Sequence, residues 1–392
     1  MFISISIGRG HIEIEREIFE TLFQNSVVSQ YADVRAALEG EPITLDKFLG
    51  LTRKAEIPYP LFFATKPVVY EQVRIKTQKL MKGFTKSSFS MHSRHAVEVR
   101  DVELIVKDLL RKQELLRAND LTLTNNKIVG MLRQHDGTVA DQARHVREAL
   151  GLSRTSFRDA RSKSAAVELF ISHLESNQVL VSRSAKNHMP QVIPNYVKFS
   201  GITIRDKKVP FIFLASGDEG EHLEASGRKL FTLALLTILI ADGTFTPVNY
   251  DGHTKEESSP REYQLAAELL MPADEFVSLN FPNLEVVKAA ADEYRVTPSA
   301  MAMRAFRLGR IPRVVFQEYM DALKTEYANR PKPRMSNARP ENALAKYNGV
   351  ECSKRMLAML DAGSLNQTEF RRVVLLNRMP TSDIAIFRKA VN

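Results

Sequence analysis

Four polar residues that follow the longest apolar run of the chain could bind a metal ion. They are Asp242, His253, Glu256 and Glu257. Hard and borderline divalent metals accept carboxylate and imidazole ligands, and His253 and Glu256 would share a face if the segment were helical. The same residues also fit a polar surface loop, and loop carboxylates seldom form a preorganised site without rigid support. We favour the loop and keep the metal site as the alternative.

Arginines in the segment 293–313 could contact nucleic acid. The segment EYRVTPSAMAMRAFRLGRIPR is typical of a helix, a tight turn and a second helix, and it places Arg304 and Arg307 on the second helix. Arginine is the usual side chain for guanine edges and phosphates. The alternative is that this helix pair packs into a core.

The last 72 residues are the second basic region. They hold 13 Lys and Arg against 7 Asp and Glu, and so carry +6 of the net charge of +9. Arg371, Arg372 and Lys389 stand in the helical patterns FRRVV and FRKA. A mixed-charge run is usually a solvated helix face, and its functional alternative is a patch for nucleic acid or an acidic partner.

Composition bounds the class of protein. Hydrophobic residues make up 44% and charged residues 26%, which is usual for globular domains and excludes disorder as the main state. The single cysteine, Cys352, excludes an internal disulfide and a cysteine-rich zinc site, and favours a reducing compartment. A reducing compartment implies a cytoplasmic protein, and the apolar run 230–241 is shorter than the about 20 residues that cross a bilayer, so we expect no membrane contact.

Hydrophobic periodicity predicts the elements that would position these residues. Three β-rich stretches predict a small sheet across residues 178–215. The apolar run predicts a buried helix at about 226–240, and a further helix ends at Pro272. Thr297 is a good N-cap, and Pro298 suits the first helical position.

Several segments in this order resemble the ImmA/IrrE family of zincin-like metallopeptidases, which often carry a helix-turn-helix domain. The segments are VPFIFLAS, KLFTLA, AAELLMPADEF (266–276) and EYRVTPSAMAMRAFRLGRI (293–311). The similarity extends over most of residues 20–320. It implies a zincin-like core and, for a typical member, zinc-dependent peptide hydrolysis.

One departure from the family pattern affects the metal site. A zinc peptidase of this type needs two histidines four residues apart on one helix and a glutamate after the first. Alignment on FTLA places the histidines at Leu235 and Leu239 and the glutamate at Leu236. The third ligand falls near Ser259, with Glu262 out of register. None of the aligned leucines can bind a metal or move a proton, so we expect neither zinc nor another cofactor.

The expected fold class is α+β, mainly helical, with a small β-sheet in a zincin-like core. The expected organisation is a degenerate helix-turn-helix-like region at 1–67, a helical middle region at 68–164, the zincin-like core at 165–320, a linker at 321–340 and a basic helical tail at 341–392.

The leading functional hypothesis is a catalytically inactive pseudopeptidase that binds a protein partner. The resemblance implies a regulatory setting such as phage control, a toxin–antitoxin pair or a stress response. The alternatives are a DNA-binding transcriptional regulator, and a metal-dependent peptidase whose ligands lie at other positions.

Overall fold

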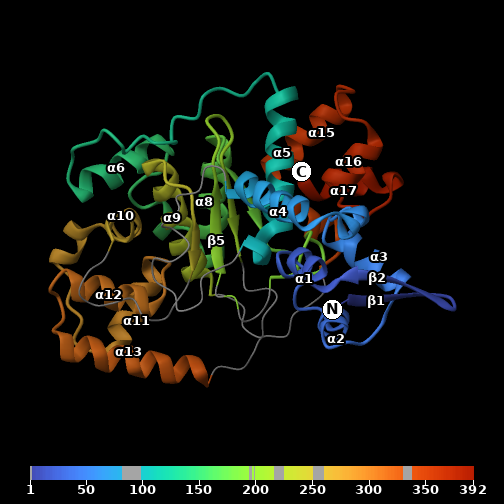
Figure 1. Cartoon of the computed structure of the whole chain (residues 1–392). Coiled ribbons are helices and arrows are strands. Elements are labelled where there is room, and N and C mark those ends of the chain that lie inside the picture. The colour runs from blue at the N-terminus through green and yellow to red at the C-terminus, as the bar shows by residue number, and fades with distance from the viewer. Residues whose placement is uncertain are drawn as a thin grey trace. The chain divides into compact units, whose positions relative to one another are not determined.

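Helices dominate the computed structural model, and the strands form two small sheets (Figure 1). The structure describes residues 2–81, 99–193, 197, 199–215, 225–249, 260–329 and 338–392. The mixed helix and strand content agrees with the expected α+β class. Within the described ranges, no helix combines the length and the hydropathy needed to cross a membrane.

The described residues fall into two compact units. One comprises those within Met1–Gly83 and Val97–Asp108, and the other those within Leu109–Asn392. This division differs from the expected organisation, in which residues 68–164 stand as a separate region. The reason is that helices in the second half of that region pack on the same core as the four-stranded sheet.

The first unit begins with a β-hairpin that periodicity analysis did not predict. β1 (Phe2–Ile7) pairs antiparallel with β2 (Gly10–Glu15), and β3 (Ile43–Thr44) pairs in parallel with β1. The alternation in FISISI explains the strand, because Ile3 and Ile5 are buried while the intervening side chains face outward. Residues 1–67 are therefore not purely helical.

The helices of the first unit enclose an aromatic core. They are α1 (Arg16–Gln24), α2 (Ala32–Leu38), α3 (Leu45–Lys54), the 3-10 helix η1 (Tyr59–Phe63), α4 (Lys66–Met81) and the first half of α5 (Val99–Asn119). Phe23 and Phe62 lie at the centre, with ring centroids 4.8 Å apart. Lys76 of α4 pairs with the buried Glu103 of α5 at 3.2 Å.

The second unit contains the four-stranded sheet. Its strands are β4 (Leu180–Arg183), β5 (Phe199–Ile204), β6 (Phe211–Leu214) and β7 (Pro247–Asn249), in the order β4-β6-β5-β7. β4 and β6 are parallel, and the other pairs are antiparallel. The sheet predicted across 178–215 is confirmed, and β7 is a short fourth strand that the sequence did not indicate.

Helices pack on the sheet of the second unit. α8 (Lys163–Ser176) contacts β4, α9 (Ser226–Asp242) contacts β5 and β6, and α14 (Pro340–Asn348) contacts β4. Val181 of β4 belongs to the α8 and α9 core, whereas the adjacent Ser182 donates a hydrogen bond to the carbonyl of Tyr347 in α14. Neighbouring residues of a strand face opposite sides. The sheet is therefore covered on both faces.

The remaining helices complete the second unit. They are α6 (Val139–Ala149), α7 (Ser156–Asp159), α10 (Arg261–Leu270), the 3-10 helix η2 (Ala273–Val277), α11 (Leu284–Glu293), α12 (Pro298–Arg307), α13 (Arg313–Ala328), α15 (Val350–Asp361), α16 (Gln367–Val373), the 3-10 helix η3 (Thr381–Asp383) and α17 (Ile384–Val391). α13 occupies the first part of the range predicted as a linker, because Phe316, Tyr319 and Leu323 recur on one face and are buried.

Candidate functional site

α9, which carries Leu235, Leu236 and Leu239, is buried along most of its length. Its residues from Thr232 to Ala241 are all buried, as expected for a helix that is apolar on every side. Gly243 ends the helix in a left-handed conformation with φ 69°. The Arg133 guanidinium donates to the last carbonyls of the helix, those of Asp242 at 3.1 Å and Gly243 at 2.8 Å. This contact fixes the C-terminal end of α9.

Packing encloses the three leucines that the family resemblance aligns with metal ligands. Leu235, Leu236 and Leu239 are 3%, 0% and 6% exposed and belong to the main core of the second unit. Leu236 lies against β5 at Gly201, where an added Cβ would approach the Leu236 side chain to 2.7 Å. Leu235 and Leu239 are four residues apart and therefore share a face of the helix.

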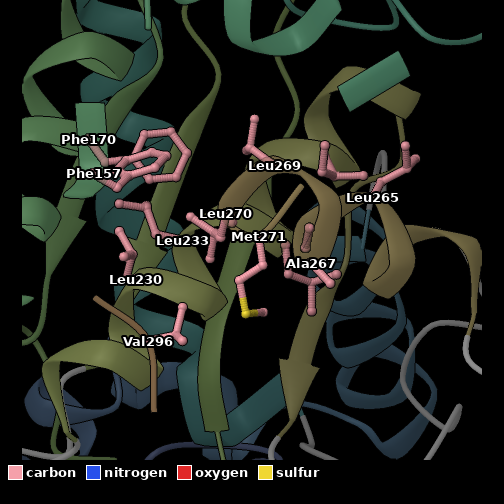
Figure 2. Close-up of a cluster of buried hydrophobic side chains, with 14 of the residues drawn as sticks. Phe157, Phe170, Leu230, Leu233, Leu265, Ala267, Leu269, Leu270, Met271 and Val296 are labelled. Atoms are coloured by element: carbon pink, nitrogen blue, oxygen red, sulfur yellow. The ribbon is translucent and has the colours of Figure 1, made fainter. Parts of the chain in front are cut away.

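The neighbouring faces of α9 pack against α7, α8 and α10. Figure 2 shows Leu230 and Leu233 near the rings of Phe157 and Phe170. The two rings meet edge to face at 5.1 Å between centroids. On α10, Arg261 pairs with Asp242 at 2.9 Å. α9 is thus held by apolar contacts along its length and by charged groups at its C-terminal end.

Only part of the alternative metal site can be placed. Asp242 is described, and its Oδ1 accepts from Arg261, while its other oxygen is buried and has no hydrogen-bond partner among the described residues. His253, Glu256, Glu257 and the aligned Ser259 lie outside the described residues. Among the residues that are described, no three His, Cys, Asp or Glu side chains gather closely enough to hold a metal ion.

The segment AAELLMP is organised around a buried carboxylate. Glu268 of α10 pairs with Arg304 of α12, and it also accepts from the backbone N–H of Ala273 at 3.1 Å. The Arg304 Nε donates to the carbonyl of Met271 at 3.1 Å. Burial lowers the pKa of Arg304, and the Glu268 charge opposes that shift. Glu268 therefore joins α10, the turn after it and α12.

The arginines considered for DNA contact lie in different surroundings. Arg304 is 7% exposed and occupied by Glu268, so it is part of the core. Arg307 is partly buried, and burial lowers its pKa. Arg371, Arg372 and Lys389 are exposed, on helices α16 and α17. Arg371 donates to a backbone carbonyl at 3.3 Å, and Arg372 lies 3.7 Å from Glu369. Among the described residues, Arg304 bonds to α10 and the turn after it, whereas Arg371 and Arg372 contact partners within the tail. These contacts do not join the two groups of arginines.

Two features were missed by sequence reasoning. Glu175, at the end of α8, is 6% exposed, and burial raises its pKa to about 7. Its Oε2 accepts from the backbone N–H of Glu351 at 3.2 Å, at the start of α15. The second feature is a group of cations around the β5–β6 turn at 205–208, which the sequence shows only as a turn signal. Neither depends on periodicity, so neither could be found from it.

Comparison with protein-family models, curated proteins and solved structures finds none that matches this chain.

Proposed function

We propose that this chain is a catalytically inactive relative of the ImmA/IrrE peptidases that acts as a regulatory or protein-interaction component. The observation that carries the proposal is the burial of Leu235 and Leu239 at the positions aligned with metal-binding histidines. A catalytic zinc site needs three ligands and an open position for water or substrate. Two core leucines supply neither ligands nor access.

The partner in this proposal is a protein, and the setting is one in which such relatives act: phage control, a toxin–antitoxin pair or a stress response. Loss of the catalytic ligands with retention of the surrounding segments favours a binding role, because the segment that carries Glu268 still has a defined structure. The proposal includes neither zinc nor another cofactor.

Metal analysis combined with a hydrolysis assay tests the loss of catalysis. Purified full-length protein is dialysed, its zinc is measured by mass spectrometry, and peptide hydrolysis is followed with and without chelator. We expect well below about 0.1 zinc per chain and no hydrolysis that the chelator abolishes. About one tightly bound zinc per chain with chelator-sensitive hydrolysis would contradict the proposal.

The variant Asp242→Asn distinguishes the proposal from the alternative of a peptidase with relocated metal ligands. Asp242 is the one candidate ligand of that set that the structure describes. If the relocated site exists, the variant loses bound metal or activity relative to the wild type. If the proposal is right, the metal content is unchanged.

Crosslinking in the native host tests the protein partner. The expected result is a stoichiometric protein partner that binds the purified chain again when both are made separately. Recovery of nucleic acid alone, with no protein in stoichiometric amount, would favour the regulator that binds DNA directly.

A further inference from the structure

Three segments of the second unit bring their cations together at one surface. The β5–β6 turn supplies Arg205, Lys207 and Lys208, the end of α5 supplies Arg117, and the loop after α5 supplies Lys127. We call these five residues the basic turn surface. Sequence reasoning missed it because the cations come from separate parts of the chain.

An ion pair and a backbone hydrogen bond hold the three segments against each other. Arg117 of α5 lies 3.3 Å from Asp206 in the turn. Asn126, which precedes Lys127, donates its backbone N–H to the carbonyl of Lys207 at 2.8 Å. Each cation of the surface therefore takes part in one of these two contacts or lies within two residues, along the chain, of a residue that does.

The one carboxylate inside the turn is already occupied. Asp206 is 8% exposed, and its Oδ1 accepts from the backbone N–H groups of Lys208 at 2.7 Å and Val209 at 2.9 Å. Its other oxygen faces Arg117. These bonds fix the conformation of the turn and keep the Asp206 carboxylate buried.

The cations themselves are available to a ligand. Lys127, Arg205 and Lys207 are exposed, and Arg117 keeps 51% of its side chain exposed. Within the described part of the chain, Lys127, Arg205, Lys207 and Lys208 form no salt bridge with a carboxylate. With Glu114 and Asp120 counted, which stand three residues before and after Arg117, the surface holds five cations against three carboxylates, and Asp120 is paired with Arg355 at 2.6 Å.

We propose that the basic turn surface binds the phosphate backbone of duplex DNA. Backbone binding needs cations that can reach successive phosphates and does not need an apolar centre. The interface of a protein partner usually has an apolar or aromatic core. In the described residues of these three segments, Leu121 is the one large apolar side chain that is exposed, so the surface has cations and no apolar core, which favours the polyanion. The inference does not rest on the inactive peptidase hypothesis and stands or fails without it.

Fluorescence anisotropy with a random duplex of about 30 base pairs tests the proposal on the full-length chain. Between about 50 and 200 mM salt we expect the affinity to fall steeply, as counterion release requires. The triple variant Arg205→Gln, Lys207→Gln, Lys208→Gln should lose at least about 10-fold in affinity at low salt and reduce the salt slope by about 3. No binding of the wild type at 50 mM salt would overturn the proposal.

A matched control removes the same charge elsewhere. The triple variant Arg371→Gln, Arg372→Gln, Lys389→Gln loses three cations on the helical tail. Its affinity for the duplex should stay within about twofold of the wild-type affinity. Equal losses in the two triple variants would show a diffuse charge effect and contradict a defined surface.

Two further measurements keep the result specific. Lys127→Gln changes a residue outside the turn and should by itself weaken DNA binding. Thermal melting checks that every variant is folded. Competition with polyglutamate tests an acidic protein instead of DNA. If polyglutamate displaces the duplex at an equal concentration of charge, the surface is not a DNA site and the proposal fails.

Discussion

Glu268 of α10 and Arg304 of α12 form an ion pair in which each side chain is only 8% exposed. The pair lies under the turn that follows α10, and each partner also bonds to backbone of that turn: Glu268 to the Ala273 N–H and Arg304 to the Met271 carbonyl. A charge at such a place is tolerated only with its partner.

Removal of one partner of this ion pair should be strongly destabilising. We expect Glu268→Gln to lower the free energy of unfolding by about 3 kcal/mol or more, because it leaves the buried Arg304 charge unpaired. Urea denaturation measures the change. Glu262→Gln, on the same helix but partly exposed, is the control and should change it by less than about 0.5 kcal/mol. A loss of similar size in both variants would contradict the special role of the pair.

A pair of histidines at the aligned positions should create a zinc site. Two imidazoles four residues apart on a helix can bind one zinc ion. We expect Leu235→His with Leu239→His to be destabilised without metal and to gain thermal stability when zinc is added. The control is Leu235→His with Leu236→His, whose side chains face different sides of α9. If both variants respond to zinc equally, the alignment of these positions is not supported.

Gly201 should not accept a side chain. A Cβ there would meet the Leu236 side chain and the Phe213 carbonyl, each at 2.7 Å. We expect Gly201→Ala to lower the free energy of unfolding of the second unit by about 1–3 kcal/mol, because the backbone carbonyl cannot move aside. Gly50→Ala provides the contrast: among the described residues, a Cβ added at Gly50 in α3 would meet no atom within 4 Å outside the local helix backbone, and alanine should stabilise that helix by up to about 1 kcal/mol. Denaturation curves of both variants check the opposite signs.

The stability of the second unit should fall as pH rises toward neutrality, through Glu175. Burial raises its pKa from 4.5 to about 7, so the protonated form is favoured in the folded state. The contribution of Glu175 to the free energy of unfolding is therefore fully present below about pH 4.5 and is lost as pH rises to about 7. Its full size is about 3 kcal/mol. The negative charge of Glu351 raises the pKa of Glu175 further, and Arg183 opposes it.

The test compares Glu175→Gln with the wild type across this pH range. The variant should lack the Glu175 part of the pH dependence, so the difference in unfolding free energy between the two proteins changes between pH 4.5 and 7. Glu148→Gln, an exposed position on α6, is the matched control and should leave the profile unchanged. A difference that stays constant across the range would mean that Glu175 does not titrate there.

Local sequence predicted several elements of the second unit correctly. The apolar run predicted α9, and the structure extends it from Ser226 to Asp242. Thr297 caps α12 as predicted, because its hydroxyl accepts from the Ala300 N–H at 3.2 Å. These features depend on neighbours three or four residues away, which the sequence contains directly.

The hairpin of β1 and β2 and the strand β7 were not predicted. β7 has three residues and is a strand because it pairs with β5. The range expected as a linker was partly wrong for a related reason: composition marked it as irregular, although α13 runs to Ala328 with a buried face. Short elements are decided by partners that lie far away in the chain.

The residues alone determined the mixed helix and strand content, the buried apolar helix α9 and the absence of metal-binding side chains at Leu235, Leu236 and Leu239. The tertiary structure decided which charges are available. It buried Arg304 against Glu268, placed the Glu175 carboxylate of α8 against the backbone at the start of α15, and gathered Lys207, Lys127 and Arg117 at one surface. The physical reason is that helical periodicity acts over a few residues, whereas burial and charge pairing depend on which distant segments meet.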